Sequence, residues 1–202
     1  MLLVIDSATE ACSVALLDED RIVAERHEIV GRGHAERLIP MIAELTGGMK
    51  PDAIFVDCGP GSFTGIRVGL AAAQGLAIGW SVPVHGYSSL ALIAAGNFAQ
   101  GEADQLTVAL HGGHGQLFVE TYAREPFRVL EPLQSLFPAE AAAAPAHLVA
   151  GSGAETLVAA RGHGEAVTAY PRAADARLLP TALRVLPPRP LYGRAPDAKP
   201  KM

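Results

Sequence analysis

Cysteine, clustered basic residues and long apolar runs are all scarce in this chain of 202 residues. The two cysteines, Cys12 and Cys58, are too few for a disulfide framework, and neither lies in a CxxC or Cys/His cluster with metal-ligand spacing. The opening apolar stretch, from Met1 to Ile5, is too short for a signal peptide or a membrane span and has no basic flank. We therefore expect a soluble, cytoplasmic protein with no membrane contact.

Positive charge is too sparse for this chain alone to bind a nucleic acid. The 16 Lys and Arg residues are outnumbered by 21 Asp and Glu residues, so the formal net charge is -5 and the pI is about 5.8. Affinity for a phosphate backbone comes from clustered basic side chains, whereas those of this chain are scattered. If RNA takes part in the function, we expect a partner to hold it.

The first half of the chain predicts the order β-β-β-α-β-α-β-α. Short apolar runs bounded by turn signals indicate strands, and apolar residues at helical spacing indicate helices. A junction at Gln100-Gly101-Glu102 suggests an N-terminal subdomain over residues 1–101. The expected strands are 2–5, 13–17, 21–28, 53–56 and 83–85, and the expected helices are 35–46, 65–80 and 88–99.

The second half is less regular, and we expect it to form a smaller C-terminal subdomain over residues 102–190. Five prolines between Pro187 and Met202 predict a C-terminal segment and tail over residues 191–202. The expected strands are 106–110, 116–122 and 147–150, and the expected helices are 139–144, 154–160 and 175–186.

Polar side chains follow the first buried strand: Asp6, Ser7 and Thr9. At a strand-to-strand turn such side chains either face a phosphate and its metal or cap the turn by bonding the local backbone. Phosphate-binding turns usually carry glycine so that backbone N–H groups can approach, and here the corresponding residue is Ala8. We favour turn capping for Asp6 and keep nucleotide binding as the alternative.

A glycine-rich loop, GPGSFTG at residues 59–65, follows a strand and opens a helix, which is the geometry in which helix N-termini bind anions. It is not a Walker loop, because no lysine follows the last glycine, and its glycine spacing is not that of dinucleotide binding. Spacing leaves two alternatives open: a structural turn capped by Ser62 or Thr64, and a phosphate cradle. The candidate nucleotide or phosphate residues are Asp6, Ser7, Thr9, Gly59, Gly61, Ser62, Thr64 and Gly65.

Small residues form a stripe along the helix that follows this loop. Gly65, Gly69 and Ala73 share one face, with Gly75 and Gly79 close by, although each interior glycine costs about 1 kcal/mol relative to alanine. Close approach of another helix or sheet would offset this cost. We expect part of the stripe to pack within the chain and the rest to lie at a subunit interface.

Two histidines, His111 and His114, flank a pair of glycines in the second half. No nearby Asp, Glu or Cys completes a tetrahedral set, so a glycine-rich turn is favoured over a metal site. The chain also has no HExxH or GxSxG motif. We therefore expect neither a catalytic apparatus nor a bound metal.

Several segments together carry a family resemblance. LVIDSATEACSVAL at residues 3–16 resembles the opening of the TsaB family, and GPGSFTGIRVGL at residues 59–70 resembles its signature loop. HAERLIP at residues 34–40 is similar to its first helix, and PLYGR at residues 190–194 is similar to its closing Pro-x-Tyr-x-Arg. The chain therefore resembles TsaB, a family that acts in making threonylcarbamoyladenosine in tRNA.

The resemblance implies an α/β chain with the actin-like ATPase (ASKHA) fold, in which two ribonuclease-H-like subdomains have mixed sheets flanked by helices. It further implies a non-catalytic scaffold that is not itself an enzyme. Such a scaffold heterodimerises with the catalytic TsaD subunit to modify tRNAs that read ANN codons. A TsaE-like ATPase joins the pair, a homodimer can form through the same face, and tRNA binds only via the complex. ATP or ADP would sit at the partner interface rather than on this chain.

The resemblance places the interface on the helices at residues 35–45 and 66–80. Two departures support a subunit without catalysis: Ala8 stands in the first turn, and His34 to Leu38 stands where TsaD binds metal through His-x-x-x-His. The second half also departs from the family, because HGGHGQLF at residues 111–118 lacks the charged residues usual there. The alternative is an actin-like ATPase or phosphotransferase that uses Asp6 and the loop at 59–65. The expected partner-binding residues are His34, Glu36, Leu38, Met41, Ile42, Leu45, Ile66, Gly69, Leu70, Ala73 and Leu76.

Overall fold

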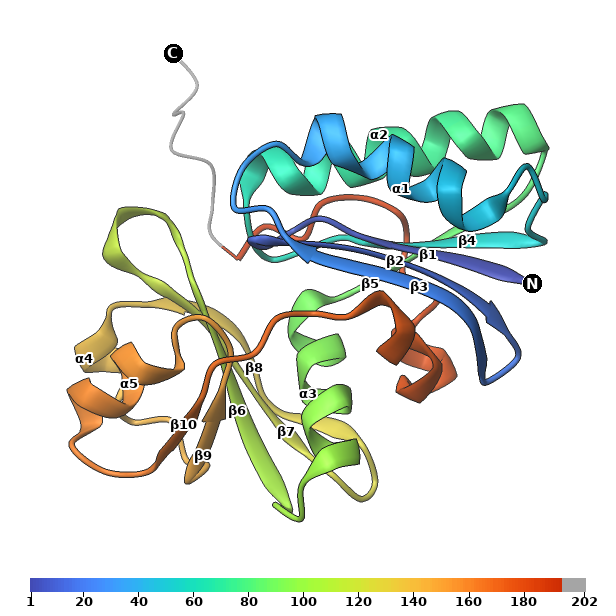
Figure 1. Cartoon of the computed structure of the whole chain (residues 1–202). Coiled ribbons are helices and arrows are strands. Elements are labelled where there is room, and N and C mark those ends of the chain that lie inside the picture. The colour runs from blue at the N-terminus through green and yellow to red at the C-terminus, as the bar shows by residue number, and fades with distance from the viewer. Residues whose placement is uncertain (194–202) are drawn as a thin grey trace, which may run out of the picture.

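A computed structural model describes residues 1–193 and contains two five-stranded mixed sheets with the same topology (Figure 1). In the first sheet the order is β3-β2-β1-β4-β5, and in the second it is β10-β9-β6-β7-β8. In chain order, the first three strands of each sheet pair antiparallel with one another, and the last two strands are added in parallel. The two mixed sheets flanked by helices are those expected for the predicted fold.

The first half follows the predicted element order. Its strands are β1 (Leu2–Asp6), β2 (Ala11–Asp18), β3 (Arg21–Ile29), β4 (Ala53–Asp57) and β5 (Val84–Tyr87), and its helices are α1 (His34–Thr46), α2 (Phe63–Trp80) and α3 (Ser89–Gln100).

The second half contains two strands that the sequence did not predict, β8 and β10. Its strands are β6 (Gln105–His111), β7 (Leu117–Ala123), β8 (Arg128–Leu136), β9 (Leu148–Ala150) and β10 (Glu165–Val167). Its helices are α4 (Pro138–Ala141) and α5 (Ala154–Arg161), followed by the 3-10 turns η2 (Ala173–Leu178) and η3 (Thr181–Leu183), and the 3-10 turn η1 (Gly113–Gly115) lies between β6 and β7.

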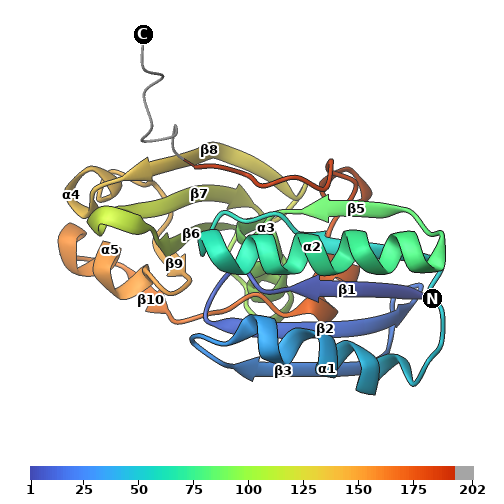
Figure 2. The ribbon, with the colours of Figure 1, turned by 90° about the horizontal axis from the view of Figure 1, so that it is seen from above.

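Helices and sheets alternate in five layers (Figure 1), and Figure 2 shows α1 and α2 lying over the first sheet. Helices α1 and α2 cover the outer face of the first sheet, α3 lies between the two sheets, and α4 and α5 cover the far face of the second. The period of two along a strand sends neighbouring side chains to opposite layers. On β1, for example, Leu3 and Ile5 pack in the α1–α2 core, whereas Val4 packs in the α3 core.

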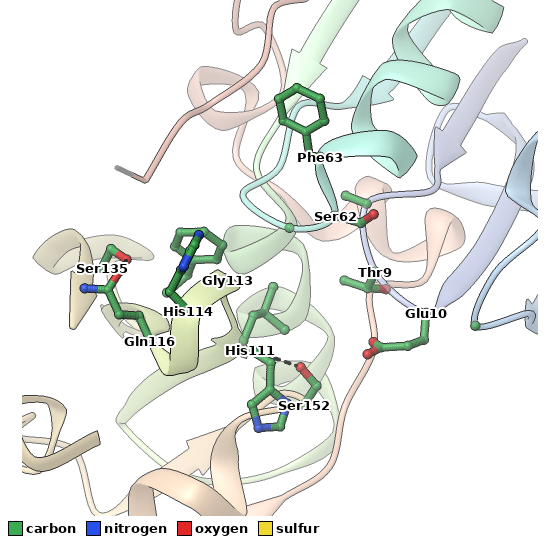
Figure 3. A pocket seen from close by; sticks show the side chains of 15 residues that line it. Thr9, Glu10, Ser62, Phe63, His111, Gly113, His114, Gln116, Ser135 and Ser152 are labelled. Carbon is green, nitrogen blue, oxygen red and sulfur yellow. Dashed lines mark hydrogen bonds between the residues drawn. The ribbon is translucent and has the colours of Figure 1, made fainter. Parts of the chain in front are cut away.

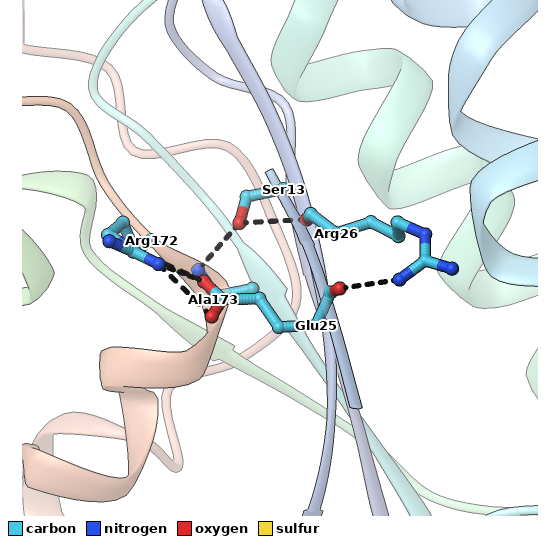
Figure 4. Close-up of polar contacts among 5 residues, drawn as sticks. All are labelled: Ser13, Glu25, Arg26, Arg172 and Ala173. Carbon is cyan, nitrogen blue, oxygen red and sulfur yellow. Dashed lines mark hydrogen bonds and ion pairs between the residues drawn. The ribbon is translucent and has the colours of Figure 1, made fainter. Parts of the chain in front are cut away.

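The segment after β10 returns to the first sheet. The helix predicted for residues 175–186 is wrong: η2 and η3 stand there instead, separated at Pro180, because proline removes a helix hydrogen bond and clashes with the preceding turn. Figure 4 shows how the return is held. The Ala173 N–H donates to the Ser13 hydroxyl at 2.9 Å, and the Arg172 guanidinium donates to both carboxylate oxygens of Glu25.

Because of this return, a segment that follows the second sheet in the sequence packs against the first sheet. Residues of η2 pack in the same core as α3 and the inner face of the first sheet, and Gly86 on β5 pairs with Leu186. The division after residue 101 therefore stays a prediction, as does the tail, because Arg194 and the residues that follow lie outside the described part of the chain. Among the described residues, no helix is long and apolar enough to cross a membrane.

Candidate functional site

The loop at residues 59–65 lies directly on the first turn. The Ser62 N–H donates to Ala8 O at 2.6 Å, and the Ser7 hydroxyl donates to Gly65 O at 2.9 Å. A Cβ atom at Gly61 would lie 2.1 Å from Ala8 O, and one at Gly65 would lie 2.0 Å from Ser7 O. Both glycines are therefore needed for backbone to approach backbone, so loop and turn fill the space between them.

Local hydrogen bonds occupy the hydroxyl groups of this region. Ser62 is the N-cap of α2, and its Oγ accepts from the Gly65 N–H at 3.2 Å, which confirms the capping alternative for Ser62. The Thr9 Oγ1 accepts from the Ala11 N–H at 3.2 Å within the turn. These bonds stabilise the turn and the helix start, and they use the N–H groups of Ala11 and Gly65, so fewer backbone donors are left to bind an anion.

Asp6 is fully buried below this turn. Its carboxyl accepts from the Ala8 N–H at 3.4 Å and from the Tyr87 hydroxyl at 3.2 Å, so it caps the turn, as favoured from the sequence. Burial raises the pKa of Asp6 well above its usual range, and the neighbouring charge of Asp57 raises it further. Asp6 thus faces the protein interior.

A pocket of about 480 Å³ opens between the two halves, beside the first turn and the β6–β7 hairpin (Figure 3). Of the predicted nucleotide or phosphate residues, Thr9, Gly61 and Ser62 line it, whereas Asp6, Ser7, Gly59, Thr64 and Gly65 do not. The lining includes the Glu10 carboxylate and no lysine or arginine. Among the described lining residues, a phosphate would meet the Glu10 carboxylate, and the basic side chains beside it are the imidazoles of His111 and His114.

The β6–β7 hairpin forms the other wall of this pocket. The Gly112 N–H donates to Gln116 O at 2.8 Å, and His114 adopts a left-handed conformation with φ 60°. The His111 N–H donates to the Ser152 hydroxyl at 3.2 Å. Among the described residues, no group of three His, Cys, Asp or Glu side chains is placed to hold a metal ion.

Most of the predicted partner-binding residues are buried in the isolated chain, so partner binding through them stays a prediction. They pack between the two helices and the first sheet. His34 is also buried, with Nε2 3.2 Å from Ala11 O, while Glu36 is exposed and Leu76 is partly buried. The inward residues are Leu38, Met41, Ile42, Leu45, Ile66, Gly69, Leu70 and Ala73.

The opposite faces of the same helices are exposed and partly apolar. Ile78 on α2 is 81% exposed and Ile39 on α1 is 49% exposed. A Cβ atom at Gly75 or Gly79 would meet nothing within 4 Å. The expected partner-binding residues did not include these four positions, although Gly75 and Gly79 were noted beside the small-residue stripe and residues 66–80 were expected at the interface. Ile78 and Gly79 follow Gly75 by three and four residues, so all three lie on one side of α2. We call Ile39, Gly75, Ile78 and Gly79 the outer face.

A groove of about 390 Å³ lies between the starts of α1 and α2. It brings together two residues predicted for partner binding, His34 and Glu36, and two predicted for phosphate, Thr64 and Gly65. The groove and the outer face belong to the same two helices. The sequence thus placed these four residues in two sites, whereas the structure gathers them in one.

Some known proteins match about 60% of this chain, and others match nearly all of it. A family model for TsaD, the tRNA N6-adenosine threonylcarbamoyltransferase, matches residues 20–176. The tRNA threonylcarbamoyladenosine biosynthesis protein TsaB of Escherichia coli is 37% identical over 129 residues, which cover 61% of this chain and 55% of that protein. The matched region thus spans about half the length of this TsaB relative and of the Haemophilus influenzae TsaB.

Longer matches extend over nearly the whole chain. An uncharacterized protein of Mycobacterium tuberculosis is 32% identical over 98% of this chain and 93% of its own length. Among solved structures, an uncharacterized Pseudomonas aeruginosa protein with similarity to the peptidase YeaZ has a TM-score of 0.78 at 31% identity, covering 96% of this chain and 99% of that one.

A second Pseudomonas aeruginosa structure, YeaZ, has a TM-score of 0.75 at 31% identity and covers 86% of this chain and 88% of that one. Together with the repeated mixed sheets, these matches confirm the actin-like α/β fold predicted from the sequence. The family model and the relatives match longer stretches of the chain than the short motifs that carried the resemblance in the sequence. The chain belongs to the TsaD-like family of proteins and, within it, to the TsaB family.

Proposed function

We propose that this chain takes part in threonylcarbamoyladenosine biosynthesis as a non-catalytic subunit that binds and activates a TsaD-like catalytic subunit. Relatives named as TsaB biosynthesis proteins support the link to this pathway. The complex modifies tRNAs that read ANN codons, in the cytoplasm, and holds the tRNA through the partner. Residues 1–101 form the docking subdomain in this proposal, and residues 102–190 form the second subdomain.

The outer face of α1 and α2 carries the proposal. Ile78 is 81% exposed, and it stands between two glycines, Gly75 and Gly79, at which a Cβ atom would meet no described atom within 4 Å. Glycines let another backbone approach closely, while an exposed isoleucine supplies apolar area that becomes buried on binding. We therefore place the TsaD-like subunit on this face, with Glu36 and Thr64 in the adjoining groove.

The interior of the molecule supports a role without catalysis. Asp6, the carboxylate that an ATPase of this fold would use, is buried and caps its own turn. The pocket between the halves has Glu10 and no lysine or arginine in its lining. Phosphoryl transfer needs positive charge where phosphate charge develops, and among the described lining residues no lysine or arginine supplies it. We place ATP or ADP, where it binds, at the partner interface.

Two further partners follow in the proposal. A TsaE-like ATPase joins the heterodimer, and a second copy of this chain uses the outer face when the catalytic subunit is absent. A homodimer on that face would exclude the catalytic subunit, because both partners bury the same side chains. Raising the concentration of the TsaD-like subunit is therefore expected to convert homodimer into heterodimer.

The test is complex formation with the TsaD-like subunit of the same organism. We expect co-elution in size-exclusion chromatography, with one copy of each chain by light scattering. In cells depleted of this protein, the threonylcarbamoyladenosine content of tRNA, measured by mass spectrometry, should fall and should recover with the intact chain. Separate elution of the two purified proteins, together with unchanged nucleoside content, would end the proposal.

A further inference from the structure

Two carboxyl groups are buried side by side under the first turn. Asp6 and Asp57 end the neighbouring parallel strands β1 and β4, and their exposed fractions are 0% and 2%. β1 pairs with β4 in parallel with Ile5 beside Val56, which brings the next residues of the two strands, Asp6 and Asp57, into interaction. Two negative charges buried this close repel each other, so the pair favours a proton on one of the two carboxyl groups.

The hydrogen bonds around the pair assign that proton. Asp57 accepts from the Ser89 hydroxyl at 2.7 Å and from the Gly59 N–H at 2.7 Å, so its oxygens are surrounded by donors. Asp6 accepts only the longer bonds from Tyr87 and Ala8, at 3.2 and 3.4 Å. Donors stabilise the charged form, so Asp57 is the ionised member and Asp6 is the protonated member.

Among the described residues, no base interacts with the pair. The titratable groups that interact with it are Tyr87 on β5, Cys58 after β4 and Cys12 on β2. All three are acids, and burial raises the pKa of Cys12 to about 11 and that of Cys58 to about 12, so they are neutral at ordinary pH. A second negative charge at Asp6 would therefore lie beside that of Asp57 with no described cation to balance it.

The pair also holds the loop that starts α2. Asp57 binds the Gly59 N–H at the beginning of the loop and the Ser89 hydroxyl at the beginning of α3. At the other end, Ser62 and Gly65 are bonded to Ala8 and Ser7, the residues that directly follow Asp6. The start of the loop is thus bonded to Asp57, and its end is bonded to the residues that follow Asp6.

We propose that Asp6 and Asp57 act as one proton-sharing latch, in which the Asp6 hydroxyl donates to the Asp57 carboxylate and keeps the loop at residues 59–65 seated on the first turn. Loss of the shared proton at high pH places two charges in contact and releases the loop. This makes the position of the α2 N-terminus dependent on pH. The inference stands whether or not α2 binds a partner.

The direction of the pH effect follows from linkage. In the unfolded chain Asp6 loses its proton near pH 4, whereas in the folded chain the raised pKa keeps the proton bound. The folded state therefore binds one more proton than the unfolded state between these two pKa values. Stability from the latch is fully present below the unfolded pKa and is lost as the pH rises through the folded pKa.

Two amide variants separate the roles of the two carboxyls. Asn in Asp6→Asn still donates to Asp57 but takes up no proton, so the variant should fold and lack the pH effect. The ratio of the wild-type to the Asp6→Asn unfolding constant should rise by up to tenfold per pH unit above pH 5 and level off at the folded pKa of Asp6. Asp57→Asn removes the acceptor charge and should be far less stable than Asp6→Asn.

The measurement is urea unfolding from pH 5 to pH 8, with hydrogen exchange at the Gly59 amide as a second readout. In the wild type, protection of that amide should decrease as the pH rises by more than intrinsic exchange accounts for, and in Asp6→Asn it should not. A pH-independent ratio of unfolding constants would overturn the proposal. So would Asp6→Asn being as damaging as Asp57→Asn, and if Asp57→Asn fails to fold, the Asp6→Asn profile still decides.

Discussion

Both faces of α2 carry glycines, but the inner face is tightly packed and the outer face is open. On the inner face, Gly65 and Gly69 are small because the Ser7 backbone or side chain would collide with a Cβ atom. On the outer face, Gly75 and Gly79 are small although nothing in the described chain approaches them. A glycine in a helix therefore reports close packing only where a neighbour is present. Where none is present, it marks a surface that another molecule could approach.

The largest expected effect is at Gly65. In Gly65→Ala the new methyl would lie 2.0 Å from Ser7 O, a backbone atom that cannot turn away. Overpacking of this kind costs about 3 kcal/mol or more in the free energy of unfolding. Chemical denaturation measures it, and a variant with wild-type stability would show that the loop does not sit on the turn as described.

Adjacent residues on α1 give the second contrast. Leu38 is fully buried and Ile39 is 49% exposed. Leu38→Ala should lower the free energy of unfolding by about 2–5 kcal/mol because it leaves a cavity, whereas Ile39→Ala should change it by less than about 0.5 kcal/mol. Denaturation of the two variants side by side checks this, and equal losses would mean that the inner and outer faces are assigned wrongly.

Ser62 gives a smaller effect at the start of α2. Ser62→Ala removes the side-chain acceptor of the Gly65 N–H and should cost about 1 kcal/mol. Ser62→Asp keeps an acceptor and is the matched control, expected to retain most of the stability. Thermal unfolding of the three proteins measures the difference, and an unchanged melting temperature in Ser62→Ala would remove the cap from the account.

The smallest effect has the opposite sign. Gly75→Ala adds a methyl into open space and replaces a poor helix former with a good one, so the isolated chain should gain roughly 0.5–1 kcal/mol. Thermal unfolding measures this gain. A loss of stability would mean that some part of the chain covers Gly75, and the contrast between the two faces of α2 would then fail.

The elements were predictable where local signals are strong. β1 and α2 were placed correctly because a continuous apolar run and a glycine-rich strand-to-helix turn mark them. β8 was missed because Pro132 and two charged residues, Arg128 and Glu131, lie inside it, and the proline is tolerated because β8 is an edge strand. The return of residues 173–186 to the first sheet depends on contacts with distant strands, which no local pattern encodes.

The site was less predictable than the fold. α2 consists almost entirely of apolar and small residues, so its periodicity could not tell the sheet-facing side from the outer face. The buried pair of Asp6 and Asp57 could not be foreseen either, because 51 positions separate the two in sequence and only parallel pairing of β1 with β4 brings them together. In the predicted phosphate loop, Gly61 and Gly65 are explained by the close packing of their backbone on Ala8 and Ser7.

The central claim is that a TsaD-like subunit binds the outer face of α1 and α2. Calorimetric titration of that subunit with Ile78→Asp, with Val129→Asp on β8 as a matched exposed control, tests it most directly. We predict that Ile78→Asp weakens binding about tenfold or more, since an interface isoleucine replaced by a charge must be buried at a cost, while Val129→Asp binds as the wild type does. Wild-type affinity in Ile78→Asp, with both variants folded, would contradict the account.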